Sequence, residues 1–170
     1  MTRVTARELA ILLGFSITAS EDFAEESIDR FFEKEHYETL RDENELFAEY
    51  PNAKQMRYIR ELVQLIYDHR LALDNMIEQH ARGWKVSRIS RTAAAIIRCA
   101  MCEILYLPDV PDAAAINEAV ELAKKYEDAE TVSFINGVLG GFIRAVKPDE
   151  AAAIEAEVAE AAEAVQTEEE

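Results

Sequence analysis

The chain contains few of the residues that break helices, cross-link a fold or anchor it in a membrane. Only five glycines and four prolines occur among 170 residues, which leaves little material for a turn-rich β architecture. Its two cysteines fit a reducing compartment, and no apolar run approaches the roughly 20 residues that span a bilayer. The N-terminus has no uninterrupted apolar segment of the signal-peptide type. We therefore expect a cytoplasmic protein with no membrane segment.

Residue patterns that carry catalysis or bind metals are also scarce. The three histidines form no HExxH pair, and neither GxSxG nor GxxxxGK[ST] occurs. Cys99 and Cys102 lie three apart in an apolar segment, without a second cysteine or histidine pair to complete a zinc site. We interpret both thiols as buried and inert. The sequence predicts no catalytic residue, no metal site and no cofactor, and thus a protein that is not an enzyme.

Positive charge is scarce and unevenly distributed. With 18 basic and 34 acidic residues, the net charge is −16. Nine acids and no base follow Pro148, whereas residues 50–148 hold twelve acids and thirteen bases. Between Glu78 and Glu103 there is no acid, and the bases there are Arg82, Lys85, Arg88, Arg91 and Arg98. This polarised charge permits a local phosphate-binding face but predicts weak non-specific binding of nucleic acid.

Apolar residues recur at helical spacing almost throughout the chain, and no stretch alternates with period two as a strand would. The expected helices are one opened by Thr5, an acidic one after Ser20, a long one from Asn52 to Gly83, one ending at Leu107, and two over residues 112–126 and 130–146. The glycines at 137, 140 and 141 indicate close approach by another helix or a ligand backbone, of which close helix packing is the simpler explanation. We predict an all-α fold, a compact single-domain bundle of about six to seven helices.

The most specific pattern lies in two helical segments near the C-terminus. Residues 115–126 read AINEAVELAKKY, and residues 134–139 read FINGVL. Upstream, residues 6–10 read ARELA, residues 96–100 read IIRCA, residues 103–105 read EIL and residues 109–111 read DVP. In order and spacing these motifs resemble the NusB family, bacterial factors that bind RNA during transcription antitermination. The resemblance covers residues 3 to about 146 and implies a NusB-like helical fold.

The resemblance also implies where RNA binds. In NusB-like proteins the RNA-binding face combines the arginine-containing N-terminus, the end of the helix with the Asn-Glu motif, and the aromatic residue before the Asn-Gly pair. Carried over by motif, the expected RNA-binding residues are Arg3, Arg7, Lys124, Lys125, Tyr126 and Phe134. Cations hold phosphates and exposed rings stack on bases, although helical spacing alone favours a core position for both rings. The expected residues of a protein-partner face are Phe15, Arg91 and Arg98.

The function implied by the resemblance is non-catalytic. The RNA target would be boxA, a short single-stranded element of nascent ribosomal RNA leader transcripts. The protein partner would be NusE, a small-subunit ribosomal protein, and the complex would bridge boxA to RNA polymerase in an antitermination complex. A homodimer is a further alternative.

This chain departs from the family pattern at several positions. It has two N-terminal arginines in place of a denser cluster, Phe15 in place of a tyrosine, and Cys102 in place of another tyrosine. The run Thr92–Ala95 replaces an acidic residue near the NusE contact. These departures concern affinity more than fold. They keep open an alternative function, a diverged helical protein-interaction adaptor with weak or no RNA binding.

The segment after Pro148 is not part of the family pattern. Residues 149–170 are rich in alanine and glutamate, with some helix propensity but few large apolar groups. We therefore divide the chain into a NusB-like helical RNA-binding domain at 1–148 and a flexible acidic tail at 149–170. The tail either keeps the protein soluble, which is the simpler reading, or lies transiently over basic residues and competes with RNA.

Overall fold

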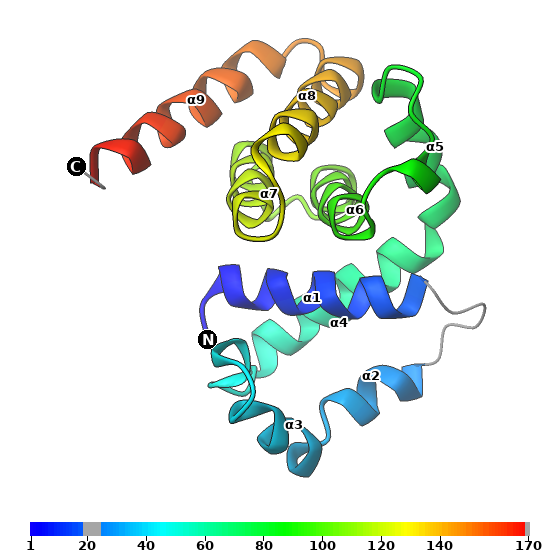
Figure 1. Ribbon diagram of the computed structural model, residues 1–170, viewed down its shortest axis with the longest axis vertical. Coiled ribbons are helices and arrows are strands. Elements are labelled where there is room, and N and C mark those ends of the chain that lie inside the picture. The colour runs from blue at the N-terminus through cyan, green and yellow to red at the C-terminus, as the bar shows by residue number, and fades with distance from the viewer. Residues whose placement is uncertain (19–24, 169–170) are drawn as a thin grey trace. The chain divides into compact units, whose positions relative to one another are not determined.

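The structure is a computed structural model that describes residues 1–18 and 25–168 (Figure 1). Within those residues the secondary structure consists of nine α-helices and two short 3-10 helices, with no strand. This confirms the all-α class predicted from the sequence. The helices form two compact units, Met1–His69 and Arg70–Glu170. No described helix is both long enough and apolar enough to cross a membrane.

The first unit is built on α1 (Arg3–Thr18) and α4 (Ala53–Asp68), which pack side by side (Figure 1). Both helices bury residues at three- and four-residue steps, such as Leu9 on α1 and Ile59 and Leu62 on α4. The predicted cap of α4 is confirmed. Asn52 Oδ1 accepts a hydrogen bond from Gln55 N at 3.0 Å, and Gln55 Oε1 accepts one from Asn52 N at 2.8 Å.

Helices α2 (Glu25–Phe31) and α3 (Lys34–Arg41), with the 3-10 helix η1 (Glu45–Phe47), carry a cluster of aromatic rings. The Tyr37 ring stacks on Phe32 with centroids 5.9 Å apart and meets Tyr50 edge-on at 5.1 Å. Its hydroxyl donates to the Glu49 carbonyl at 3.1 Å. Burial, reinforced by the neighbouring Tyr50, raises the pKa of Tyr37 to about 12. Contacts among these rings hold together the short helices α2, α3 and η1.

The second unit contains α5 (Arg70–His80), η2 (Val86–Arg88), α6 (Arg91–Tyr106), α7 (Asp112–Tyr126), α8 (Ala129–Val146) and α9 (Ala151–Glu168). Helix α6 packs against α5, α7 and α8 and is the most extensively buried helix (Figure 1). Ser90 Oγ caps it by accepting from Ala93 N at 3.1 Å. Both cysteines of α6 are buried, as predicted, and neither forms a disulfide. Burial together with Glu103 raises the pKa of Cys102 to about 12.

The helix count exceeds the prediction because two expected helices are each interrupted and because α9 forms in the segment predicted to be a tail. The acidic helix divides into α2 and α3 where Glu33 takes an extended conformation, with φ −60° and ψ 125°. The long helix divides into α4 and α5 at His69, whose φ of −103° and ψ of 10° end the first of them. The predicted start after Ser20 lies outside the described residues. Apolar spacing continues across both breaks, so periodicity alone does not reveal them.

The segment predicted to be a tail forms helix α9, which contacts α7 and α8. Ala151 and Ile154 are buried, and Val158 and Ala162 continue the same stripe at helical spacing. Together with α7 and α8 the helix borders a groove of about 580 Å³. Small side chains, which the sequence analysis counted as too weak to dock, allow a close approach between helices. The 148/149 domain boundary and the flexibility of this segment stay predictions.

The glycines of α8 differ in their surroundings. A Cβ added at Gly141 would lie 3.1 Å from His80 Nδ1, so the end of α5 approaches α8 closely there. This is the close helix packing predicted as the simpler explanation. A Cβ added at Gly137 would meet nothing within 4 Å, so no neighbour requires glycine at that position.

Candidate nucleic-acid interface

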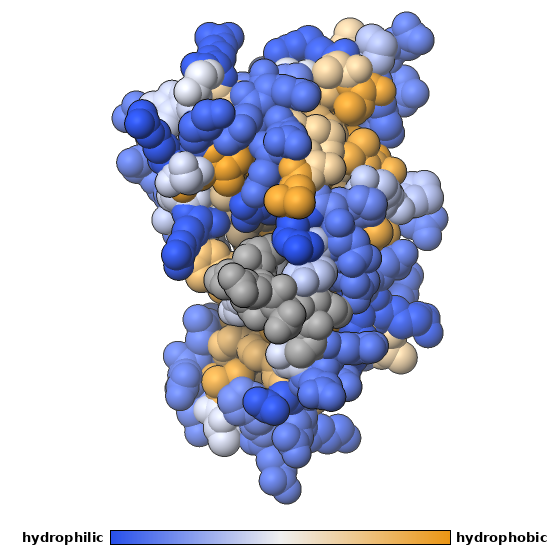
Figure 2. All heavy atoms as spheres, turned by 90° about the vertical axis from the view of Figure 1, so that its right-hand side faces the viewer, coloured by the Kyte–Doolittle hydropathy of each residue, from blue (hydrophilic) through white to orange (hydrophobic). Residues whose placement is uncertain are grey.

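The residues predicted to bind RNA or a partner fall on both units. Arg3, Arg7 and Phe15 belong to the first, and the other six belong to the second. Apolar side chains reach the face shown in Figure 2 in separate small groups among hydrophilic ones.

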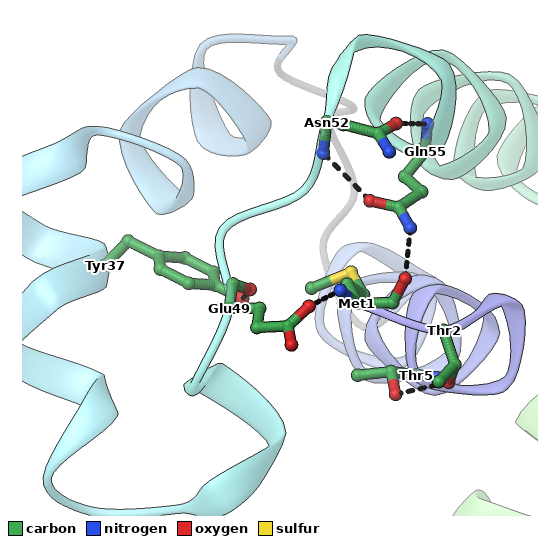
Figure 3. Close-up of polar contacts among 7 residues, drawn as sticks. All are labelled: Met1, Thr2, Thr5, Tyr37, Glu49, Asn52 and Gln55. Atoms are coloured by element: carbon green, nitrogen blue, oxygen red, sulfur yellow. Dashed lines mark hydrogen bonds and ion pairs between the residues drawn. The ribbon is translucent and has the colours of Figure 1, made fainter.

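A network of polar contacts anchors the N-terminus of the first unit (Figure 3). The Met1 ammonium pairs with the Glu49 carboxylate, and Gln55 Nε2 donates to the Met1 carbonyl. Thr2 Oγ1 accepts from Thr5 N at 3.1 Å, which starts the first turn of α1. These contacts fix the position of Arg3, the first residue of α1, whose side chain is exposed.

Arg7, the other N-terminal arginine, is buried where Arg3 is exposed. Arg7 is 2% exposed, and its neighbours Ala6 and Glu8 are also buried. Phe15 is half-buried. The motif that suggested Arg7 therefore marks a residue that is buried on α1. Of the two predicted arginines, Arg3 alone offers its charge to solvent.

In the second unit, the C-terminal end of α7 presents two lysines and a tyrosine. Lys124 Nζ pairs with Glu121 Oε1 at 2.7 Å, and Lys125 Nζ lies 5.3 Å from the centre of the Tyr126 ring. The Tyr126 side chain is 44% exposed. Cations in the last turn also stabilise the helix dipole, which alone would explain their position.

Phe134 is half-buried on α8 and faces a residue that the sequence analysis did not select. Its ring centroid lies 6.4 Å from that of Trp84, with 58° between the ring planes. Trp84 is 54% exposed and lies in the turn between α5 and η2. The two rings border a groove of about 320 Å³, and a second groove of about 360 Å³ lies beside it. A lone tryptophan in a turn has no helical periodicity, so the only signal was its place within the run of bases.

The bases around Trp84 are largely uncompensated. Arg82, Arg88 and Arg91 are exposed, and no carboxylate among the described residues forms an ion pair with them. Lys85 Nζ lies 3.6 Å from Glu78 Oε2. As far as the described part of the chain shows, these three guanidinium groups are therefore available to an external anion.

Arg98 differs from these arginines. Its Nε donates to Asp74 Oδ1 at 2.6 Å, which joins α6 to α5 inside the unit. The side chain is 14% exposed. The structure thus gives Arg98 an internal partner, and its role at a partner surface stays a prediction.

A hydrogen bond joins the basic run to the end of α7. Ser90 Oγ, at the start of α6, donates to the carboxylate of Glu127, the residue after Tyr126. Ser90 also lines the groove beside Phe134. The end of α7, the start of α6 and the Trp84–Phe134 groove therefore form one continuous surface. Exposed cations beside accessible rings are the chemistry that single-stranded RNA requires.

Comparison with known proteins identifies the family. The sequence profile described as the NusB family matches residues 4–144. The chain belongs to the NusB family. The transcription antitermination protein NusB of Acetivibrio thermocellus is 36% identical over 144 residues, which cover 85% of this chain and 90% of the relative. That of Symbiobacterium thermophilum is 35% identical, with 86% and 92% covered. The resemblance predicted from the motifs is confirmed.

Solved structures show the NusB fold in the same way. The structure of T. maritima NusB superposes with a TM-score of 0.64 at 22% identity, covering 89% of this chain and 96% of that one. A chain in the crystal structure of a plectonemic RNA supercoil superposes with a TM-score of 0.60 at 27% identity, covering 84% and 94%. The family profile thus covers nearly all of α1 to α8, and its match ends before α9. The curated relatives bear the name of a transcription factor and not of an enzyme.

Proposed function

We propose that this protein is a non-catalytic transcription antitermination factor that binds boxA RNA of nascent ribosomal RNA transcripts together with NusE and bridges it to RNA polymerase. The observation that carries the proposal is the continuous surface of the second unit, where Arg82 and Arg88, which pair with no described carboxylate, line the grooves beside accessible aromatic rings. Membership of the NusB family supports the antitermination role, because the relatives carry that name.

The surface explains how a strongly acidic protein binds RNA. Arg88, with the lysines of α7, neutralises phosphates, and Tyr126 and Phe134 offer ring surface to unpaired bases. Each neutralised phosphate of a single strand releases counterions and adds about −0.7 to the slope of log affinity against log salt. The net charge of −16 repels RNA elsewhere on the molecule. Binding is therefore confined to this surface and to Arg3.

The role of the protein in this scheme is assembly. It holds RNA and NusE together so that the complex remains attached to RNA polymerase in the cytoplasm. Phe15, Arg91 and Arg98 are the residues that the family resemblance assigns to the protein-partner face. Among them Arg98 is held by Asp74, so we assign it a positioning role behind the surface. A homodimer, if it forms, competes with NusE for the same face.

Terminator readthrough in a transcription extract depleted of this protein tests the proposed function. Added protein should restore readthrough on a template with a boxA leader and have little effect when boxA is scrambled. Replacing Lys124 and Lys125 by alanine should reduce the restoration. Lys34→Ala should not, because that exposed lysine belongs to the acidic part of the first unit. Equal readthrough with and without the protein would reject the antitermination role and favour the adaptor alternative.

A further inference from the structure

Trp84 is the one tryptophan of the chain, and more than half of its side chain is exposed. Tryptophan is usually well buried, because its ring contributes a large apolar area to a core. The exposure of this ring does not come from an irregular backbone. Two consecutive residues before it, Arg82 and Gly83, adopt left-handed conformations with φ of 47° and 87°. The Trp84 amide then donates to the Ala81 carbonyl at 3.1 Å. A defined turn therefore projects the indole from the surface.

The left-handed Arg82 strengthens this reading. A residue other than glycine adopts that conformation at an energetic cost, because its Cβ then crowds the following carbonyl oxygen. Such a conformation persists only where the surrounding structure enforces it, and it is found preferentially at functional positions. The turn also leads directly into η2, which carries Arg88 to the edge of the groove.

The groove beside Trp84 has the size and the chemistry for an aromatic ring. Its volume of about 320 Å³ lies at the lower end of the range for small-molecule sites. Phe134 is inclined by 58° to the indole and does not cover it face to face. One guanidinium, of Arg88, and one carboxylate, of Glu130, line the groove with Ser90 and Thr131. These groups supply both donors and acceptors to the polar edge of a ring.

The charge around the groove selects the kind of ligand. Arg82, Lys85, Arg88 and Arg91 fall within ten consecutive residues, and that stretch has no acid. An apolar peptide side chain needs no such concentration of cations, whereas a base attached to a phosphate backbone uses rings and cations together. A base in a duplex hides its faces by stacking, so the matching ligand is an unpaired base.

We propose that the groove between Trp84 and Phe134 binds one unpaired nucleobase of RNA, stacked on the exposed indole of Trp84. Arg88 holds the adjoining phosphate, and Arg82 extends the path of the backbone beyond the turn. The inference rests on the proposed function, which requires RNA on this unit. It adds a base site that the family-derived set of residues does not contain.

The intrinsic fluorescence of Trp84 tests the site directly, because no other tryptophan contributes. Titration of the full-length protein with a single-stranded boxA oligonucleotide should quench the emission, since a stacked base quenches an indole. The same oligonucleotide annealed to its complement should leave the emission nearly unchanged. Anisotropy of the labelled oligonucleotide, measured in the same samples, reports whether RNA is bound at all.

Variants then measure the contribution of the ring. Trp84→Ala should weaken binding of the single strand by about 5- to 150-fold, the range for loss of one stacked base. Trp84→Phe keeps a ring and should retain most of the affinity. Leu71→Ala, which removes another exposed apolar side chain of this unit, is the matched control and should change nothing. Thermal melting of each variant verifies that it is folded.

The outcomes separate this inference from the function on which it rests. RNA binding with unchanged Trp84 emission and an unchanged affinity of Trp84→Ala would overturn the base site and leave the proposed function standing. Quenching by NusE in the absence of RNA would assign the groove to a protein partner instead. Failure of the unaltered protein to bind RNA, with or without NusE, would refute the proposed function and the base site with it.

Discussion

The ion pair between Arg98 and Asp74 gives a quantitative test of how the second unit is held together. Arg98 is 14% exposed and Asp74 is 31% exposed, so water reaches the carboxylate more easily than the guanidinium. Hydrogen bonds to charged groups contribute about 1.5–3 kcal/mol to stability. We expect Asp74→Ala to lower the free energy of unfolding by about 2 kcal/mol, because it leaves a mostly buried guanidinium without its acceptor.

Removing the arginine should lower the free energy of unfolding by less than removing the aspartate. Arg98→Met keeps the apolar stem in place and leaves a carboxylate that water can hydrate, for a loss of about 1 kcal/mol. The double variant should then lose about 2 kcal/mol, which gives a coupling energy of about 1 kcal/mol. Urea denaturation followed by circular dichroism measures all three values. Strict additivity of the two single changes, combined with loss of NusE binding in Arg98→Met, would show that Arg98 acts at the partner surface instead.

Three further predictions concern the helices and the aromatic cluster. Gly137→Ala should raise the free energy of unfolding by about 0.5–1 kcal/mol, because the added methyl meets no atom within 4 Å. Gly141→Ala should raise it less, since its methyl would lie 3.1 Å from the ring of His80. Equal shifts of the melting temperature in the two variants would contradict this difference. Tyr37 keeps its proton in the folded state up to its pKa of about 12, whereas an unfolded tyrosine loses its proton near pH 10. The free energy of unfolding should therefore fall as the pH rises from about 10 to about 12, and it should fall less steeply in Tyr37→Phe. A chain ending at Pro148 lacks α9 and should melt at a lower temperature than the full chain yet bind boxA more tightly at low salt; identical affinities at every salt concentration would reject competition by the acidic segment.

Local signals in the sequence were sufficient for much of the fold. Asn52 caps α4 as its side-chain chemistry predicts, and the apolar stripe of α6 lies in the core. The interruption at His69 was not predictable, because apolar spacing continues through it and only the backbone angles reveal the break. Helix α9 was missed for another reason. The buried side of α9 contains small residues such as Ala151, and whether such residues pack depends on the helices that α9 contacts, α7 and α8.

The candidate site was predictable in part. The motif around Phe134 and the lysines of α7 pointed to the end of the second unit where the candidate surface lies, but it did not single out Trp84. Its ring contact with Phe134 arises from tertiary packing between residues 50 positions apart in the chain. Helical periodicity predicts only contacts within one helix and does not reveal it. The same limit applies to Arg7. A motif match marks it as basic, while its burial depends on the helices that surround α1.

Fluorescence anisotropy of labelled boxA RNA, against this protein with and without NusE over a series of salt concentrations, tests the central claim most directly. The account predicts preference for boxA over a scrambled sequence, enhancement by NusE, and a log–log salt slope of about −0.7 for each phosphate neutralised. Equal binding of boxA and scrambled RNA under all of these conditions would contradict it. The protein would then be a NusB-family adaptor whose basic surface serves another partner.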